Sequence, residues 1–406
     1  MNKVLIIGAG SIGTLIGASL LKAGFDVTFA GRPGSAYTAK IKHHGLSILY
    51  PSGEQFWLAP SLRRIRFVDT EKELKEKFKL IVVAVKSHHL ASLTSYIRVH
   101  STKNTILLHA QNGIPYWWFD DKAYLSSLNP TLFNKINTCR YLNSVDRDGM
   151  ILESLGDRTL VGCVIKAPCS KTAPSQIEVK KPPKMIIGLT KSEGNYEQKQ
   201  IISQLGNLFS IYGLETSYTS KIRAEVCHKL AINLATNVLS ALTGRIISEL
   251  TSNSHINKLI ENILLEINKI FQIYGIERAN LPTQEKIYAY IKQPGSQRHL
   301  PSLAQDFSHQ KKGEVSLISA PVEMAQIAEI QSPILFSLSE LLRLGQTYAL
   351  NNSNGKFNLL TFDKFSGHFL LNDDAWKSNI LSGLERSNLF TCLARINLLA
   401  LEQNAA

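Results

Sequence analysis

A glycine-rich turn near the start of the chain constrains the fold more than any other feature. Lys3 to Ile7 is a short, almost entirely apolar run, which is typical of a strand buried on both faces of a parallel sheet. Gly8-Ala9-Gly10-Ser11-Ile12-Gly13 follows, and then a helical stretch that ends before Gly24. Asp26 to Ala30 predicts the next strand. In this order of strand, turn, helix and strand, GxGxxG indicates a dinucleotide-binding unit.

The three glycines of the turn have separate physical roles. Gly8 allows the tight turn, Gly10 lets the backbone approach a pyrophosphate, and Gly13 lets the helix pack closely on the strand. The N–H groups and the partial positive charge at the helix N-terminus favour the phosphates. We therefore predict that the cofactor is bound by Gly8, Ala9, Gly10, Ser11, Ile12 and Gly13.

The end of the second predicted strand indicates which dinucleotide binds. An NAD site usually places Asp or Glu there, on the ribose 2′-hydroxyl. Here the chain reads Phe29-Ala30-Gly31-Arg32-Pro33, with no acidic residue. The guanidinium of Arg32 can hold a 2′-phosphate by paired hydrogen bonds, which predicts NADPH. The alternative is that Arg32 is a solvated loop residue.

Two further apolar runs predict strands that end in polar residues. Leu80 to Val85 leads into Lys86, and Thr105 to Leu108 leads through His109 to Asn112. Open parallel sheets bind ligands just beyond the carboxyl ends of their strands. Lys86 and Asn112 are therefore candidate ligand contacts.

The composition limits the class of protein. With 406 residues, 44% hydrophobic and 19% charged, the chain fits a globular protein of two or three domains rather than a disordered one. The net charge of +13 permits anionic ligands, but the basic residues are scattered and no nucleic-acid motif is present, so we expect no nucleic acid partner. The uncharged run Val4 to Leu21 imitates a membrane segment, but its glycines favour the strand and helix, so we expect no membrane span.

The spacing of the cysteines and of adjacent like residues indicates whether the chain has a metal site and in which redox compartment it folds. The five cysteines never form CxxC, which favours a reducing cytoplasm over a disulfide scaffold or zinc site. Adjacent residues do not share one face of a helix or strand, so we interpret adjacent histidine and acidic pairs as surface groups and expect no metal. These pairs are His43-His44, His88-His89, Asp120-Asp121 and Asp373-Asp374.

The chain becomes helical after about residue 220, where no convincing strand run follows. Glu225 to Thr243 contains no Pro or Gly and ends before Gly244. Within it Lys229, Asn233 and Asn237 are spaced four apart, which places an amine and two amides along one helix face. An exposed polar stripe is one interpretation, but the low polarity of the rest of the helix favours a cleft lining. Further helices are predicted at His255 to Tyr274, Pro282 to Ile291, Ala320 to Ala328 and Pro333 to Leu350.

Over about residues 1–348 the sequence resembles the ketopantoate reductase (2-dehydropantoate 2-reductase) family. Glu314 follows Ser302 by twelve residues, which is the spacing in that family between the substrate serine and the glutamate. The QNGIPYWW motif resembles a subgroup with a QNGIPWW-like sequence. The motifs are GAGSIG at 8–13, Arg32, VKS at 85–87, QNGIPYWW at 111–118, IRAE at 222–225, KLAINLATNVLSALTG at 229–244 and SLAQD at 302–306.

The resemblance implies a fold, a reaction and a set of residue roles. The fold is an α/β N-terminal Rossmann-type parallel-sheet domain plus an all-α C-terminal domain. The reaction is NADPH-dependent reduction of a 2-oxo acid, with 2-dehydropantoate as the leading substrate and pantothenate synthesis as the pathway. The resemblance implies that Lys229 is the general acid, and that Glu314 holds the substrate hydroxyl and positions the lysine. It also implies that Ser302 contacts the substrate carboxylate and that Lys86 and Asn112 lie near the cofactor. The implied substrate-orienting amides are Asn112, Asn233 and Asn237.

Several departures from the family pattern leave the substrate open. Pro301 precedes the substrate serine, and Cys227 replaces an aromatic residue two positions before Lys229. A reductase of another branched 2-oxo acid and a non-catalytic NADP-binding sensor are the alternatives. We predict a cofactor domain at 1–218, a helical substrate domain at 219–350, and an extension at 351–406 that packs on the body, joins a homodimer contact or binds a partner.

Overall fold

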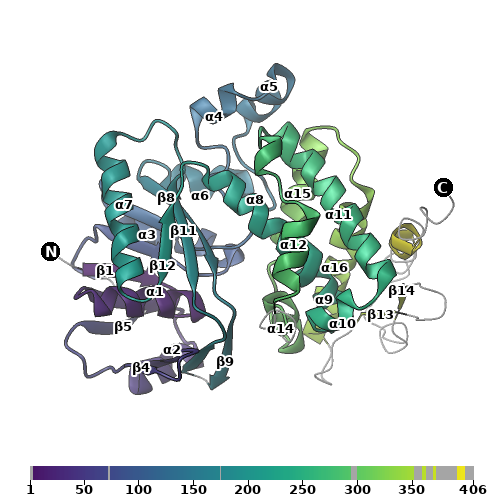
Figure 1. The fold of residues 1–406 in the computed structure, drawn as a ribbon. Coiled ribbons are helices and arrows are strands. Elements are labelled where there is room, and N and C mark those ends of the chain that lie inside the picture. The colour runs from purple at the N-terminus through teal and green to yellow at the C-terminus, as the bar shows by residue number, and fades with distance from the viewer. Residues whose placement is uncertain are drawn as a thin grey trace. The chain divides into compact units, whose positions relative to one another are not determined.

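The computed structural model describes residues 3–71, 74–173, 175–293, 300–351, 359–362, 369–371 and 391–397 (Figure 1). The chain forms two compact units, which we describe separately. The first comprises residues 1–127 and 136–226, and the second comprises residues 128–135 and 227–406. The domain boundaries expected at 218/219 and 350/351 stay predictions.

The first unit is built on an eight-stranded sheet with the order β12-β11-β8-β7-β6-β1-β2-β5. All neighbouring strands are parallel except β8 and β11, which confirms the predicted Rossmann-type sheet. The strands are β1 (Lys3–Ile7), β2 (Asp26–Gly31), β5 (Ile65–Asp69), β6 (Leu80–Val83), β7 (Ile106–His109), β8 (Thr159–Lys166), β11 (Lys184–Leu189) and β12 (Glu215–Tyr218).

The order of the strands fixes where a ligand can bind. From β1 the chain proceeds to β2 on one side, while β6 lies on the other side of β1. A reversal of this kind opens a crevice at the carboxyl ends of the strands. The helices of this unit are α1 (Ser11–Lys22), α2 (Ala36–His44), α3 (Thr94–Val99), α4 (Lys122–Ser126), α6 (Met150–Leu155) and α7 (Tyr196–Ile211).

A second sheet, with the order β4-β3-β10-β9, was not predicted. Its strands come from distant parts of the chain, and β3 pairs in parallel with β10 through Ser47 and Gln176. Its apolar side chains join those of α1 in one core cluster. The strands are β3 (Leu46–Leu49), β4 (Gln55–Leu58), β9 (Cys169–Ala173) and β10 (Gln176–Val179).

The acidic pair Asp120-Asp121 contradicts the surface interpretation. Asp121 is buried, and its carboxylate accepts hydrogen bonds from the Ser192 amide at 2.9 Å and the Ser192 hydroxyl at 2.6 Å. Asp120 forms an ion pair with Lys191 at 3.0 Å. The prediction of a surface pair was wrong because Ser192, which is 71 residues away in the sequence, reaches Asp121 only in the folded chain. Asp373-Asp374 lies outside the described residues.

The second unit is mainly helical, as predicted. α8 (Ile222–Asn233) begins in the first unit and continues into the second. It leads into the π-helical segment η4 (Leu234–Val238) and α9 (Leu239–Thr243), which ends at Gly244. The other helices are α5 (Pro130–Thr138), whose residues up to Lys135 belong to this unit, α10 (Ile247–Thr251), α11 (Ser254–Ile273), α12 (Gln284–Ile291), α14 (Ser302–Ser308), α15 (Ser316–Ile327) and α16 (Pro333–Asn351).

The C-terminal extension contains two short strands, so the expectation of no strand after about residue 220 is wrong. β13 (Leu360–Phe362) and β14 (Phe369–Leu371) pair antiparallel. Residues 391–397 are helical, and Cys392, Leu393 and Ile396 are buried. These described parts of the extension therefore contribute to the core of the second unit. Within the described part of the chain, no helix is long and apolar enough to cross a membrane.

Two glycines offer a matched test of the packing. In α7, a Cβ at Gly206 would lie 3.6 Å from its nearest neighbours, which is ordinary contact. In β8, a Cβ at Gly162 would lie 2.7 Å from Ile222 and 2.8 Å from the Trp117 ring. We expect Gly206→Ala to raise the free energy of unfolding by about 0.5–1 kcal/mol and Gly162→Ala to lower it by about 1–3 kcal/mol. Denaturant unfolding measures both, and an equal effect of the two substitutions would contradict the packing described here.

Candidate active site

The glycine turn lies where β1 passes into α1. Gly8 has a φ of +101°, and its amide donates to the Ala30 carbonyl at 2.9 Å. A Cβ at Gly13 would overlap the Gly8 carbonyl oxygen. A Cβ at Gly10 would meet no atom within 4 Å, and its φ of −75° suits any residue. Packing of the protein therefore explains Gly8 and Gly13, whereas the space at Gly10 is open for a ligand.

The N-terminus of α1 is suited to an anion. No side chain caps it, and its first turn contains no acidic residue. Ser11 and Ile12 are partly exposed there, and Ala9 is buried. Free N–H groups at the start of a twelve-residue helix favour a phosphate.

Arg32 directly follows β2 and is exposed. Because β2 is parallel to β1, Arg32 lies at the same sheet edge as the glycine turn. Tyr37 of α2 donates its hydroxyl to the Ala9 carbonyl at 2.7 Å, which ties α2 to the glycine turn. Burial raises the pKa of Tyr37 to about 12, so its hydroxyl keeps the proton that it donates.

Lys86 and Asn112 lie at this edge as well. The Ala84 amide donates to the Ile7 carbonyl at 2.9 Å, and the Ala110 amide donates to the Val83 carbonyl at 2.9 Å. The chain after β6 and β7 thus continues side by side. The side-chain amide of Gln111 joins the two loops by donating to the Val85 carbonyl at 2.9 Å. The structure therefore brings the glycine turn, Arg32, Lys86 and Asn112 to one edge of one sheet.

His109 is a buried residue that was not among the predicted site residues. It ends β7, with Nε2 2.7 Å from the Tyr116 hydroxyl. Burial lowers the pKa of His109 to about 3, so the ring is neutral near pH 7. Its contact spans the loop that carries Asn112 and holds the two ends of that loop together. Its position at the end of the apolar run of β7 could have indicated burial of His109, but nothing local indicated Tyr116.

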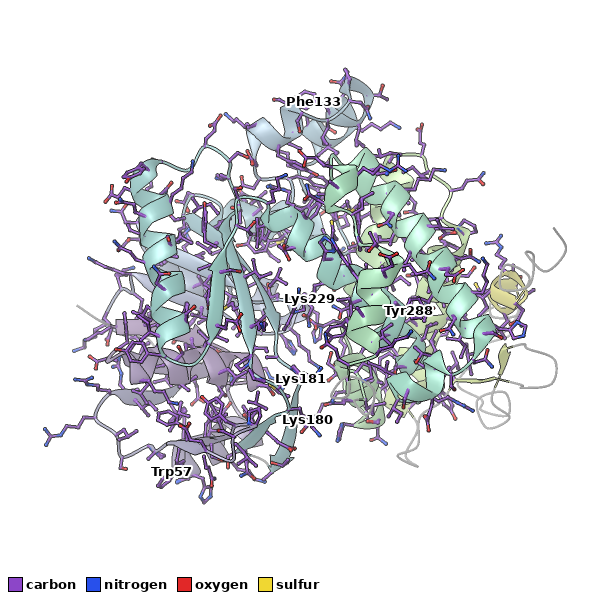
Figure 2. All side chains as sticks on the ribbon, in the orientation of Figure 1. Trp57, Phe133, Lys180, Lys181, Lys229 and Tyr288 are labelled. Atoms are coloured by element: carbon purple, nitrogen blue, oxygen red, sulfur yellow. The ribbon has the colours of Figure 1, made fainter. Side chains whose placement is uncertain are left out.

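In the second unit, Asn233 and Asn237 meet across the change from α-helix to π-helix. The side-chain Nδ2 of Asn237 donates to Oδ1 of Asn233 at 3.4 Å, and each residue is only 8% exposed. The buried Nδ2 of Asn233 has no hydrogen-bond partner among the described residues. Lys229 lies one turn earlier on α8 and is partly exposed, and Figure 2 labels it there. π-helical segments are frequent at functional sites.

Ser302 and Glu314 are carried by segments next to η4. Ser302 begins α14 and is exposed, whereas Glu314 is buried between α14 and α15. Both helices pack against η4. Gly313 fixes the position of the Glu314 backbone, because its amide donates to the Gln346 side chain at 3.0 Å and a Cβ there would overlap Leu303. This unit thus collects Asn237, Ser302 and Glu314 on neighbouring segments.

Within the described ranges, no group of three or more His, Cys, Asp or Glu side chains is placed to hold a metal ion. His43 and His44 are exposed on α2, while His88 and His89 are partly buried.

Comparison with known proteins identifies the family. The family described as "Ketopantoate reductase PanE/ApbA" matches residues 4–115, and "Ketopantoate reductase PanE/ApbA C terminal" matches residues 221–346. Together these matches cover more than half of the chain. A 2-dehydropantoate 2-reductase from Mesorhizobium japonicum is 26% identical over 344 residues, which are 84% of this chain and 97% of that protein. One from Halobacterium salinarum is 22% identical over 345 residues, covering 85% and 99%.

Solved structures agree in fold. A ketopantoate reductase from Ralstonia eutropha gives a TM-score of 0.65 at 19% identity, covering 86% of this chain and 99% of that one. D-mandelate dehydrogenase with NADH and anilino(oxo)acetate gives 0.66 at 17% identity, with the same coverage. At these identities the structural likeness shows the fold alone. On the family matches, the chain belongs to the ketopantoate reductase family of oxidoreductases.

Proposed function

We propose that the protein reduces 2-dehydropantoate to pantoate with NADPH, as a step of pantothenate and coenzyme A synthesis. The observation that carries this proposal is the buried amide pair Asn233 and Asn237, one turn beyond Lys229. Burying an amide N–H without a partner costs about 1–3 kcal/mol. The Nδ2 of Asn233 bears such a cost among the described residues, which is reasonable where a polar substrate supplies the acceptor.

Each proposed site residue has a separate role in the reaction. When bound, NADPH supplies the hydride that reduces the carbonyl carbon. Charge then develops on the carbonyl oxygen, and Lys229 donates a proton to it. Glu314 holds the resulting hydroxyl and orients Lys229. Ser302 contacts the substrate carboxylate.

Three amides are proposed to orient the substrate. Asn233 and Asn237 present N–H groups from the helical unit, and Asn112 presents one from the sheet edge. Lys86, at the same edge, contacts cofactor and substrate and contributes positive charge toward a carboxylate and phosphates.

The cofactor proposal rests on the glycine turn and Arg32. The open space at Gly10 and the uncapped α1 fit a pyrophosphate. D-mandelate dehydrogenase was solved with NADH. In this chain β2 ends at Gly31-Arg32 without an acidic residue, which favours NADPH over NADH.

A second candidate is reduction of a different 2-oxo acid. D-mandelate dehydrogenase, with its bound anilino(oxo)acetate, has the same fold. A non-catalytic sensor is less well supported, because a binding protein needs no proton donor at Lys229. We place the reaction in the cytoplasm, because the chain has only five cysteines and none of them form a CxxC pattern. We propose a homodimer, because a ketopantoate reductase from Staphylococcus aureus with this fold is dimeric.

The glycine turn gives a first test. Gly10→Ala should leave thermal stability nearly unchanged, yet raise the Kd for NADPH about tenfold or more, because the methyl group occupies the space for the pyrophosphate. Gly13→Ala should instead lower the free energy of unfolding by about 1–3 kcal/mol through overpacking. Fluorescence titration and thermal unfolding separate the two effects. Unchanged affinity in Gly10→Ala would contradict this location for the cofactor.

Substrate and cofactor choice are tested together. We expect a panel of branched and aromatic 2-oxo acids to show the highest kcat/KM with 2-dehydropantoate and NADPH.

Arg32→Ala should raise KM for NADPH about tenfold, because a charged hydrogen bond to phosphate is lost, while NADH kinetics change little. Arg63→Ala, which removes another exposed arginine of the same unit, is the control. Equal losses with both cofactors would show that Arg32 does not contact the 2′-phosphate, and turnover of no panel member would favour the sensor.

The proposed proton donor is tested by a double-mutant cycle. Lys229→Ala should lower kcat about 10²–10⁴-fold, the usual span for a general acid, with NADPH affinity nearly unchanged. Glu314→Ala should lower kcat/KM, and the double variant should lose less than the product of the single losses if the two act as one unit. Lys258→Ala, on α11 of the same unit, should keep normal turnover. Near-normal turnover of Lys229→Ala would exclude it as the proton donor.

A further inference from the structure

Arg223, in the first turn of α8, is held by hydrogen bonds, an ion pair and aromatic rings. The centre of its guanidinium lies 4.2 Å from the Tyr124 ring and about 6 Å from the rings of Trp117 and Trp118, at 5.8 Å and 6.0 Å. Its Nε donates to the Trp118 carbonyl at 3.0 Å, and its Nη1 donates to the Thr190 carbonyl at 3.0 Å. Arg223 is only 9% exposed.

A buried carboxylate balances the charge of Arg223. Oδ2 of Asp121 lies 3.6 Å from Nη1 of Arg223. The same oxygen accepts from the amide and the hydroxyl of Ser192, and Oδ1 accepts from the Ala123 amide at 3.1 Å. The position of Arg223 is therefore defined by charge, by hydrogen bonds and by aromatic faces, which a flexible ammonium cannot reproduce.

A pair of glycines sets the start of α8 against the sheet. Gly162 of β8 and Gly188 of β11 are cross-strand partners. A Cβ at Gly162 would lie 2.7 Å from Ile222 and 2.8 Å from Trp117, and a Cβ at Gly188 would lie 3.0 Å from Ile222. The first residue of α8 and the Trp117 ring therefore both contact the sheet where it has no side chains.

The two segments that meet at Arg223 both lead to proposed site residues. Trp117 and Trp118 belong to the QNGIPYWW segment, in which Asn112 lies five residues before Trp117. Lys229 lies six residues after Arg223 on the same helix, about 9 Å along its axis. A small rotation of the first turn of α8 would displace Lys229.

We propose that Arg223 is a positioning residue for the reductase reaction. It holds the first turn of α8 to the Trp117–Trp118 segment and so fixes the placement of Lys229. This rests on the proposed function of Lys229. Arg223 itself contacts neither substrate nor cofactor in this role.

The test compares two buried arginines. Arg158 is also 9% exposed in the same unit, and its guanidinium bonds the Ser101 hydroxyl at 2.6 Å and the Ser154 carbonyl at 2.9 Å. Arg223→Lys should lower kcat about 10²-fold, the scale for a misplacement near 1 Å, with an unchanged Kd for NADPH. Amides of residues 227–237 should exchange hydrogen faster than in the parent protein. Arg158→Lys should change neither kcat nor that exchange.

A second pair of variants keeps the test decisive if Arg223→Lys does not fold. Tyr124→Leu removes the nearest ring and retains the charges, whereas Tyr124→Phe retains the ring. We expect the leucine variant to show the same loss of kcat and the same faster exchange as Arg223→Lys. The phenylalanine variant should keep the kcat and the exchange rates of the parent protein.

Distinct outcomes overturn the two proposals. Parent-like kcat and exchange in Arg223→Lys would overturn the positioning role, as would equal losses of kcat in Arg223→Lys and Arg158→Lys. If the parent protein reduces no 2-oxo acid, the proposed function fails, while the exchange of residues 227–237 still decides whether Arg223 orders the helix.

Discussion

The close approach of helix α1 to the central strands is the constraint on which the first unit depends. A Cβ at Gly13 would overlap the Gly8 carbonyl oxygen, and a Cβ at Gly17 would overlap the Phe29 ring. Because the helix can lie this close, its first N–H groups face the edge at which β1 and β2 end. Arg32, Lys86 and Asn112 follow strands that end at the same edge. A binding site for an anionic dinucleotide is a consequence of this packing, since no strand has to distort to form it.

Much of this fold was predictable because its signals are local. β1 and β2 are short apolar runs separated by a glycine turn, and the structure places them at Lys3–Ile7 and Asp26–Gly31. The helical unit was predictable from the absence of Gly and Pro between Glu225 and Thr243. The ends of the strands were predicted less accurately. The strand predicted at Leu80 to Val85 ends two residues earlier, at Val83, because the apolar run continues past the last hydrogen bond between the strands.

The features that escaped prediction depend on contacts between distant residues. β3 pairs with β10 through residues 47 and 176, and neither strand has a long alternating pattern. Asp121 looks like a surface residue beside Asp120, and only the fold brings Ser192 and Arg223 to it. The spacing of Asn233 and Asn237 predicted a shared face, but the π-helical turn between them carries no sequence signal. The spacing of Ser302 and Glu314 came from a family resemblance, and the structure adds that both flank η4.

Asp121 and Asn233 are both buried polar residues, but they differ in how far their hydrogen bonds are satisfied within the protein. Both oxygens of Asp121 accept hydrogen bonds, so its burial is compensated within the protein and stabilises one arrangement of the chain. Asn233 is buried to a similar degree, but its Nδ2 has no acceptor in the described part of the molecule. An apolar side chain at this position would carry no desolvation cost, so an amide there is reasonable where a polar ligand supplies the acceptor. The contrast between these two sites supports the proposal that Asn233 serves a ligand, whereas the burial of Asp121 is explained by contacts within the protein.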